Sequence, residues 1–162
     1  MTMQIGLVGS DGIVVASDTR WTHEPNNLTS AQIGRAVRFG TNGIKIKVNM
    51  TQQVAVSFAA DRPSAASMAD ELLAKLSADA SPDAMAIFQE AFDAIPTRER
   101  NNVQGFIVLI RPALQLFRFE VGKKNRKWLA SCEPVFGYGV AGDVTNPRLV
   151  LGRTVPRRKP SS

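Results

Sequence analysis

The second residue of the chain, Thr2, offers the most reactive chemistry in the sequence. If Met1 is removed, Thr2 becomes the N-terminal residue and carries a hydroxyl group and a free amine on one carbon skeleton. A hydroxyl beside a free amine can supply a nucleophile and its base from a single residue. The sequence therefore predicts a nucleophilic site at the start of the chain.

Other residue types with special chemistry are scarce. The chain holds one cysteine, Cys132, and one histidine, His23. A single cysteine excludes an internal disulfide and fits a reducing compartment. A metal site would need carboxylates alone, and no cluster with ligand spacing occurs, so we expect neither a metal nor a cofactor.

A β-hairpin must position Thr2. Residues 4–9 and 13–17 are largely apolar and flank Ser10-Asp11-Gly12, a typical hairpin turn. Residues 21–43 are polar and predict a long loop, which is often functional in a compact domain. Residues 44–48 alternate, so Lys45 and Lys47 are expected on one face of a strand, and residues 54–59 form the returning strand.

Two helices follow these strands. Apolar residues recur at helical spacing over 65–76 and over 84–95. Ser81 is expected to cap the second helix, with Pro82 at its first position and Asp83 at the positive end of the helix dipole. Extended segments return over residues 105–111, 114–120, 128–132 and 134–138.

Strands, a helix pair and further strands predict an α+β fold with two antiparallel sheets packed face to face and helices outside. In a four-layer αββα sandwich each sheet needs a helical cover, and the sequence supplies only one helix pair. The second helical layer is therefore expected to be incomplete: either a neighbouring subunit covers that sheet or the chain lacks a last segment. We expect one domain over residues 1–143 and an irregular basic tail over 144–162.

Composition narrows the class of protein. Of the 162 residues, 44% are hydrophobic and 21% charged, which is typical of a globular protein with a real core. No apolar run approaches a membrane span and the first residues do not form a signal peptide, so we expect no membrane and a cytoplasmic location. The net charge of +6 is concentrated in the tail and near residue 125. Nucleic-acid binding is not expected, because only Trp128 lies among these basic residues.

Four segments carry a family resemblance. Thr2 stands directly before an apolar strand, and Asp18-Thr19-Arg20 closes the hairpin. Asn42-Gly43-Ile44-Lys45-Ile46 contains a Gly-x-Lys sequence, and residues 54–61 lead into the first helix. In this order the segments resemble the proteasome β-subunit family of N-terminal-nucleophile hydrolases, in a bacterial form. The resemblance covers most of residues 2–77 and implies the four-layer fold of that family.

The resemblance also implies roles for individual residues. Thr2 would be the nucleophile, and Lys45 would be the lysine that lowers the pKa of the terminal amine, which is about 7.7–8.0 when unperturbed. Asp18 would keep Lys45 charged and oriented, and Arg20 would brace the end of the hairpin. Backbone N–H groups near Ala59 would stabilise the oxyanion.

The chain also departs from the family pattern. Ala59 replaces a glycine that leaves room for the substrate backbone. Tyr138, in Gly137-Tyr138-Gly139, stands where the family has a serine that supports the terminal amine, unless the correspondence shifts toward Ser131. Two later helices and an Asp-x-x-Ser-Gly segment of the family have no counterpart that we can identify.

The resemblance implies a threonine-type endopeptidase subunit of a self-compartmentalising particle. Such a subunit would form a homo-oligomeric ring and take peptides or unfolded proteins as substrate. The resemblance also implies an ATP-dependent unfoldase as a possible partner. The alternative is a catalytically inactive structural subunit of the same fold, which the departures favour. A basic nucleic-acid-binding module is a third reading, and it rests only on the tail.

Overall fold

The computed structural model of the chain describes residues 3–18, 21–23, 38–40, 44–60 and 65–142. Thr2 and Arg20 lie outside the described residues, and so does the tail predicted over 144–162. No helix in the described ranges is long and apolar enough to cross a membrane.

The order of strands, a helix pair and further strands is as the sequence pattern predicted. Among the described residues, six strands rather than the expected four precede the helices, and four follow them. The strands are β1 (Met3–Val8), β2 (Ile13–Ser17), β3 (Trp21–His23), β4 (Arg38–Gly40), β5 (Ile46–Asn49), β6 (Val54–Ala60), β7 (Val103–Leu109), β8 (Gln115–Lys124), β9 (Lys127–Pro134) and β10 (Tyr138–Gly142). The helices are α2 (Ala65–Ala78), α3 (Ala84–Ala94) and the short 3-10 helix η1 (Thr97–Glu99).

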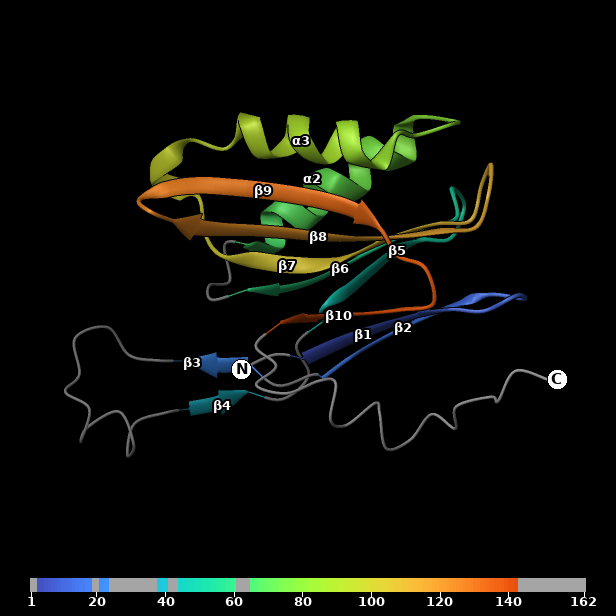
Figure 1. Cartoon of the computed structure of the whole chain (residues 1–162), viewed down its shortest axis with the longest axis horizontal. Helices are drawn as coiled ribbons and strands as arrows, with labels where there is room; N and C mark the ends of the chain where they lie inside the picture. Colours follow the sequence, from blue (N-terminus) through green and yellow to red (C-terminus); the bar gives the residue numbers. More distant parts are fainter. Residues whose placement is uncertain (1–2, 19–20, 24–37, 41–43, 61–64, 143–162) are drawn as a thin grey trace, which may run out of the picture.

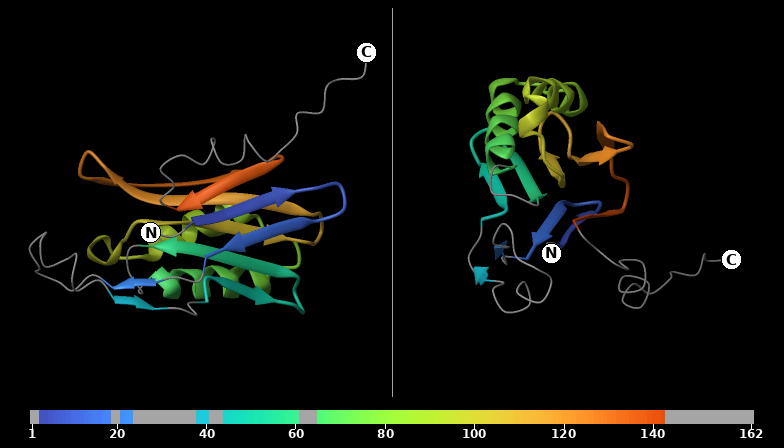
Figure 2. Two further views of the ribbon diagram at one scale, coloured as in Figure 1. Left: turned by 90° about the horizontal axis from the view of Figure 1, so that it is seen from below. Right: turned by 90° about the vertical axis from the view of Figure 1, so that its left-hand side faces the viewer.

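Two antiparallel sheets form the centre of the molecule. One has five strands in the order β5-β6-β7-β8-β9, and the other has three in the order β10-β1-β2. β3 and β4 pair separately as a short ladder. In Figure 1 the helices α2 and α3 lie on one side of the five-stranded sheet and the three-stranded sheet lies on the other. The right-hand view of Figure 2 shows the same succession of layers from another side.

The main core lies between the helices and the five-stranded sheet. It contains seventeen buried apolar residues, among them Phe88 of α3 and Phe119 of β8, whose ring centroids are 5.3 Å apart. The sequence stripe of α3 is confirmed, because Ala84, Phe88, Ala91 and Phe92 are all buried. Alternation along the strands sends every second side chain to this face, which is therefore largely apolar, with Lys47 at its margin.

A smaller apolar cluster lies between the two sheets, around Phe106, Leu116 and Ala141. The Phe106 ring packs beneath two glycines, Gly6 and Gly139, which face each other across β1 and β10. A Cβ atom on either glycine would lie 3.1 Å from Phe106 Cε1. The absence of these two side chains lets the sheets approach closely at this point.

Three predictions about local structure were wrong. The segment 21–43 contains the paired strands β3 and β4 rather than loop alone. Asp83, not Ser81, caps α3: its Oδ1 atom accepts hydrogen bonds of 3.1 Å from the amides of Met85 and Ala86. The last strand runs over 138–142 rather than 134–138, because its register is set by pairing with β1, which the local sequence does not reveal.

Candidate active site

An ion pair joins the two sheets at the end where β2 finishes. Lys45 Nζ donates to Asp18 Oδ1. The Lys45 side chain is 2% exposed and that of Asp18 is 37% exposed. A buried ammonium group is costly unless an opposite charge compensates it, so the carboxylate of Asp18 is needed to keep Lys45 in this position. The structure thus brings together the two residues whose pairing the family resemblance implied.

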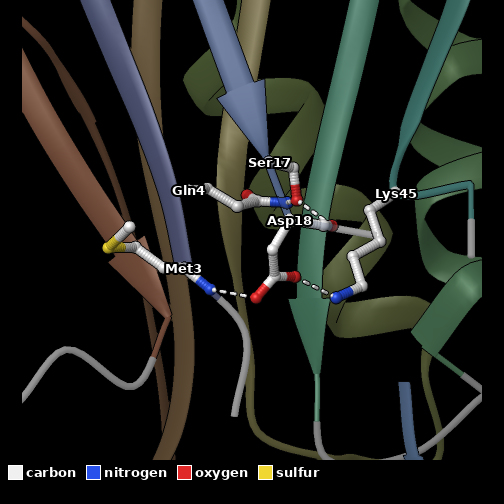
Figure 3. Close-up of polar contacts among 5 residues, drawn as sticks. All are labelled: Met3, Gln4, Ser17, Asp18 and Lys45. Carbon is white, nitrogen blue, oxygen red and sulfur yellow. Dashed lines mark hydrogen bonds and ion pairs between the residues drawn. The ribbon is translucent and has the colours of Figure 1, made fainter. Parts of the chain in front are cut away.

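The second oxygen of Asp18 reaches the start of the chain. Asp18 Oδ2 accepts a hydrogen bond of 3.3 Å from the amide of Met3, and the Asp18 amide donates to the Met3 carbonyl at 3.2 Å. Figure 3 shows Asp18 between Met3 and Lys45, with one carboxylate oxygen directed to each. Met3 is joined to Thr2 by a peptide bond, so this carboxylate ties the N-terminal end of β1 to the buried lysine.

Lys45 and Lys47 do not share a face, although the sequence alternation predicted that they would. β5 begins at Ile46, so Lys45 precedes the strand and turns toward Asp18. Its carbonyl accepts a hydrogen bond of 2.9 Å from Phe58 of β6. Lys47 instead donates to Asp70 and to the Ala66 carbonyl of α2. Two lysines of one segment therefore serve opposite sides of the five-stranded sheet.

A chain of buried polar groups continues inward from Asp18. Ser17 Oγ donates to the Asp18 carbonyl at 3.0 Å and accepts from Gln4 Nε2 at 3.3 Å. Gln4 Oε1 accepts from Ser57 Oγ at 3.0 Å, and Ser57 Oγ accepts from the Phe106 amide at 3.0 Å. Gln4 and Ser57 are buried. Neither residue was among the predicted site residues, yet a glutamine and a serine within otherwise apolar strands were a usable signal.

The structure brings Ala59 near this region but not Tyr138. Ala59 is buried in β6 and directly follows Phe58, the residue bonded to Lys45. Tyr138 is 55% exposed and pairs with Leu7, at the other end of β1 from Met3. The β10 residue opposite Met3 is Gly142, whose amide donates to Gln104 Oε1 at 2.8 Å.

A cavity and a cysteine lie elsewhere among the described residues, and neither involves the predicted site residues. A cavity of about 450 Å³ lies among α2, the end of α3, η1 and the start of β7, and none of the predicted site residues lines it. Burial raises the pKa of Cys132 to about 12, with smaller contributions from Asp83 and Glu133, so its thiol is unreactive near neutral pH. Within the described ranges no three of the residue types that ligate metals lie together.

The geometry can be compared with known proteins. No family model and no curated protein sequence matches the chain. Among solved structures the fold is similar to that of eukaryotic HslV from Trypanosoma brucei, with a TM-score of 0.55 over 99% of this chain and 82% of that chain. The sequence identity is 12%, at which the likeness concerns the fold alone. The chain therefore has a proteasome-like α+β fold, as the resemblance in its sequence implied.

Proposed function

We propose that the chain is a threonine-type endopeptidase subunit of a proteasome-like particle, with Thr2 as its N-terminal nucleophile after removal of Met1. One observation carries the proposal: a buried lysine, Lys45, is paired with a carboxylate, Asp18, whose other oxygen binds the amide of the residue next to Thr2. The proteasome-like fold supports the same function.

The proposed reaction is an acyl transfer to Thr2. The Thr2 amine takes the hydroxyl proton as Thr2 Oγ attacks the carbonyl carbon of a peptide, and the Lys45 ammonium group favours the neutral amine that this requires. Backbone N–H groups near Ala59 stabilise the oxyanion. The C–N bond then breaks, the leaving amine takes the proton, and water hydrolyses the ester to release the acyl product and restore Thr2.

Assembly is a further part of the proposal. The resemblance implies a homo-oligomeric ring, and the outer face of the three-stranded sheet presents exposed apolar side chains, including Leu7, Val14 and Tyr138. Exposed apolar patches of this kind mark interaction sites. Light scattering of the purified chain tests this part by giving its mass in solution. Unfolded-protein substrates and an ATP-dependent unfoldase are proposed on the resemblance alone, and a cytoplasmic location is proposed on the composition of the sequence.

The decisive experiment is intact mass measurement after incubation with a peptide epoxyketone, which reacts with N-terminal threonine. We expect loss of Met1 and one covalent adduct in the wild type and no adduct in Thr2→Ala. A trimmed chain that remains unmodified, or a chain that retains Met1, would contradict the peptidase proposal.

Lys45 and Lys47 provide a matched pair of variants. Lys45→Ala removes the cation beside Asp18 and should slow adduct formation about 100-fold or more, the range found for acid–base groups. Lys47→Ala removes the same side chain from the helix-facing side and should change the rate by about twofold or less. Equal rates for both variants would show that Lys45 has no special role.

One observation favours a second candidate, a structural subunit without peptidase activity. Tyr138 pairs with Leu7, away from Met3, and therefore does not supply a hydroxyl to the end of the chain that carries Thr2. An inactive subunit would assemble normally in Lys45→Ala and in the wild type alike, and neither would take up the epoxyketone.

A further inference from the structure

The hydrogen-bond chain between Phe106 and Asp18 runs in one direction. A backbone N–H can only donate, so the Phe106 amide requires Ser57 Oγ to accept. The Ser57 proton is then free for Gln4 Oε1. The amide group of Gln4 must accordingly turn its Nε2 atom to Ser17. The donor and acceptor of each hydrogen bond between Phe106 and Ser17 are therefore fixed by the protein groups themselves.

The chain ends on the residue that carries the candidate carboxylate. Ser17 Oγ accepts from Gln4 and so has its proton available for the Asp18 carbonyl, at 3.0 Å. The row of hydrogen bonds therefore connects β6 and β7 of the five-stranded sheet to the main chain of Asp18 at the end of β2. Figure 3 shows Gln4 and Ser17 directly beside the Asp18–Lys45 pair.

This chain of hydrogen bonds, the relay, crosses between the two sheets beside the apolar cluster, because Ala141 of that cluster pairs with Gln4. The apolar cluster between the sheets is centred on Phe106, Leu116 and Ala141, whereas Lys45 comes from the five-stranded side and Asp18 from the three-stranded side. The alignment of this ion pair depends on how the two sheets are held relative to one another. Gln4 and Ser57 are 0% and 2% exposed, so water does not compete for their hydrogen bonds.

We propose that Gln4 is a positioning residue that, through Ser57 and Ser17, holds Asp18 in register with Lys45 and the Met3 amide. This inference rests on the proposed function for its catalytic meaning. Gln4 does not contact the reacting atoms, and it acts only through the placement of Asp18. Gln4 lies in β1, two residues after Thr2 in the sequence.

The test combines Gln4→Met, which keeps the length of the side chain and removes its hydrogen bonds, with hydrogen exchange resolved to single amides in the full chain. We expect exchange at Met3 and Asp18 to become about tenfold faster. The amide of Gly9, which donates to Gly12 at the other end of the same hairpin, should be unchanged. Equal changes at Asp18 and Gly9, or none, would overturn the proposal.

The catalytic readout is the reaction with the epoxyketone as a function of its concentration. In Gln4→Met the maximal rate of adduct formation should fall while the concentration for half-maximal rate stays the same, because the substrate surface is intact. Ser57→Ala should behave like Gln4→Met, and Ser57→Thr, which keeps the hydroxyl, should restore the wild-type rate. Failure of the threonine variant to exceed the alanine variant would count against the relay.

Two further variants separate positioning from general loss of stability. Val108→Ala removes packing from the apolar cluster between the sheets and should leave exchange at Asp18 and the adduct rate unchanged; a matching loss in this variant would overturn the proposal. If Gln4→Met does not fold, Ser17→Ala cuts the relay at its partly exposed end. A wild type that forms no adduct refutes the proposed peptidase, whereas the exchange at Asp18 still decides whether Gln4 positions it.

Discussion

The two faces of the five-stranded sheet are built differently. The face toward α2 and α3 packs seventeen buried apolar residues, and the ion pair on that side, between Lys47 and Asp70, lies at its exposed margin. The space toward the three-stranded sheet holds a smaller cluster of three buried apolar residues, Phe106 and Leu116 of the five-stranded sheet and Ala141 of β10. It also holds a line of buried polar groups that ends at Asp18 and Lys45. One face supplies most of the apolar burial, and the other uses polar contacts to fix a geometry.

This division predicts that the largest loss of stability arises on the helix side. Phe88→Ala removes a ring that is 1% exposed and contacts Phe119, and it should lower the free energy of unfolding by about 3–5 kcal/mol. Phe136 is 86% exposed, so Phe136→Ala should change the free energy of unfolding by about 0.5 kcal/mol or less. Urea denaturation of both variants measures the difference. A small loss in Phe88→Ala would break the contrast between the two faces.

A smaller effect is expected between the sheets. In Gly6→Ala the new Cβ atom would lie 2.8 Å from Leu116 Cδ2 and 3.1 Å from Phe106 Cε1, and overpacking of this kind costs about 1–3 kcal/mol. Gly12→Ala is the control, because no atom lies within 4 Å of a Cβ at Gly12. The same denaturation assay applies. Equal stability of the two variants would mean that the glycine pair does not set the sheet spacing.

The smallest effect concerns Cys132, on the helix-facing side of β9. Burial raises its pKa from 9.0 to about 12, so alkylation at pH 8 should be slower than in the urea-unfolded chain and should accelerate as the pH approaches 12. The folded state retains the thiol proton to a higher pH than the unfolded state does. The contribution of Cys132 to stability is therefore complete below pH 9 and is lost as the pH rises toward 12. Rapid alkylation of the folded chain at pH 8 would show that this side is less well packed.

The sequence predicted the parts of the fold that depend on local pattern. β2 occupies the residues expected from its apolar run, Ile13–Ser17, and the helical stripe from Ala84 to Phe92 is buried as expected. The pairing of Asp18 with Lys45 could be predicted only from a family resemblance, because the two residues lie 27 positions apart. The α+β class with two antiparallel sheets is likewise as expected.

Other features depend on contacts that no local pattern contains. The register of β10 follows from its pairing with β1, so the position of Tyr138 could not be deduced from the glycines around it. Gln4 is a polar residue in an apolar strand, but no role was predicted for it, because its partner Ser57 is 53 positions away. Lys45 and Lys47 were expected on one face because both alternate with apolar residues. The expectation fails because β5 begins only at Ile46, and Lys45, which precedes it, pairs with Asp18.

Phe106 belongs to both regions between the sheets. Its ring lies against Gly6 and Gly139, and its amide begins the chain of hydrogen bonds that leads to Asp18. Close-packed interiors transmit displacement rather than absorb it. A partner that presses on the outer side of β1 and β10 would move this ring. The Phe106 amide would move with it and would shift the hydrogen bonds that lead to Asp18. In the proposed ring, Phe106 would therefore connect a subunit contact on these strands to the alignment of the Asp18–Lys45 pair.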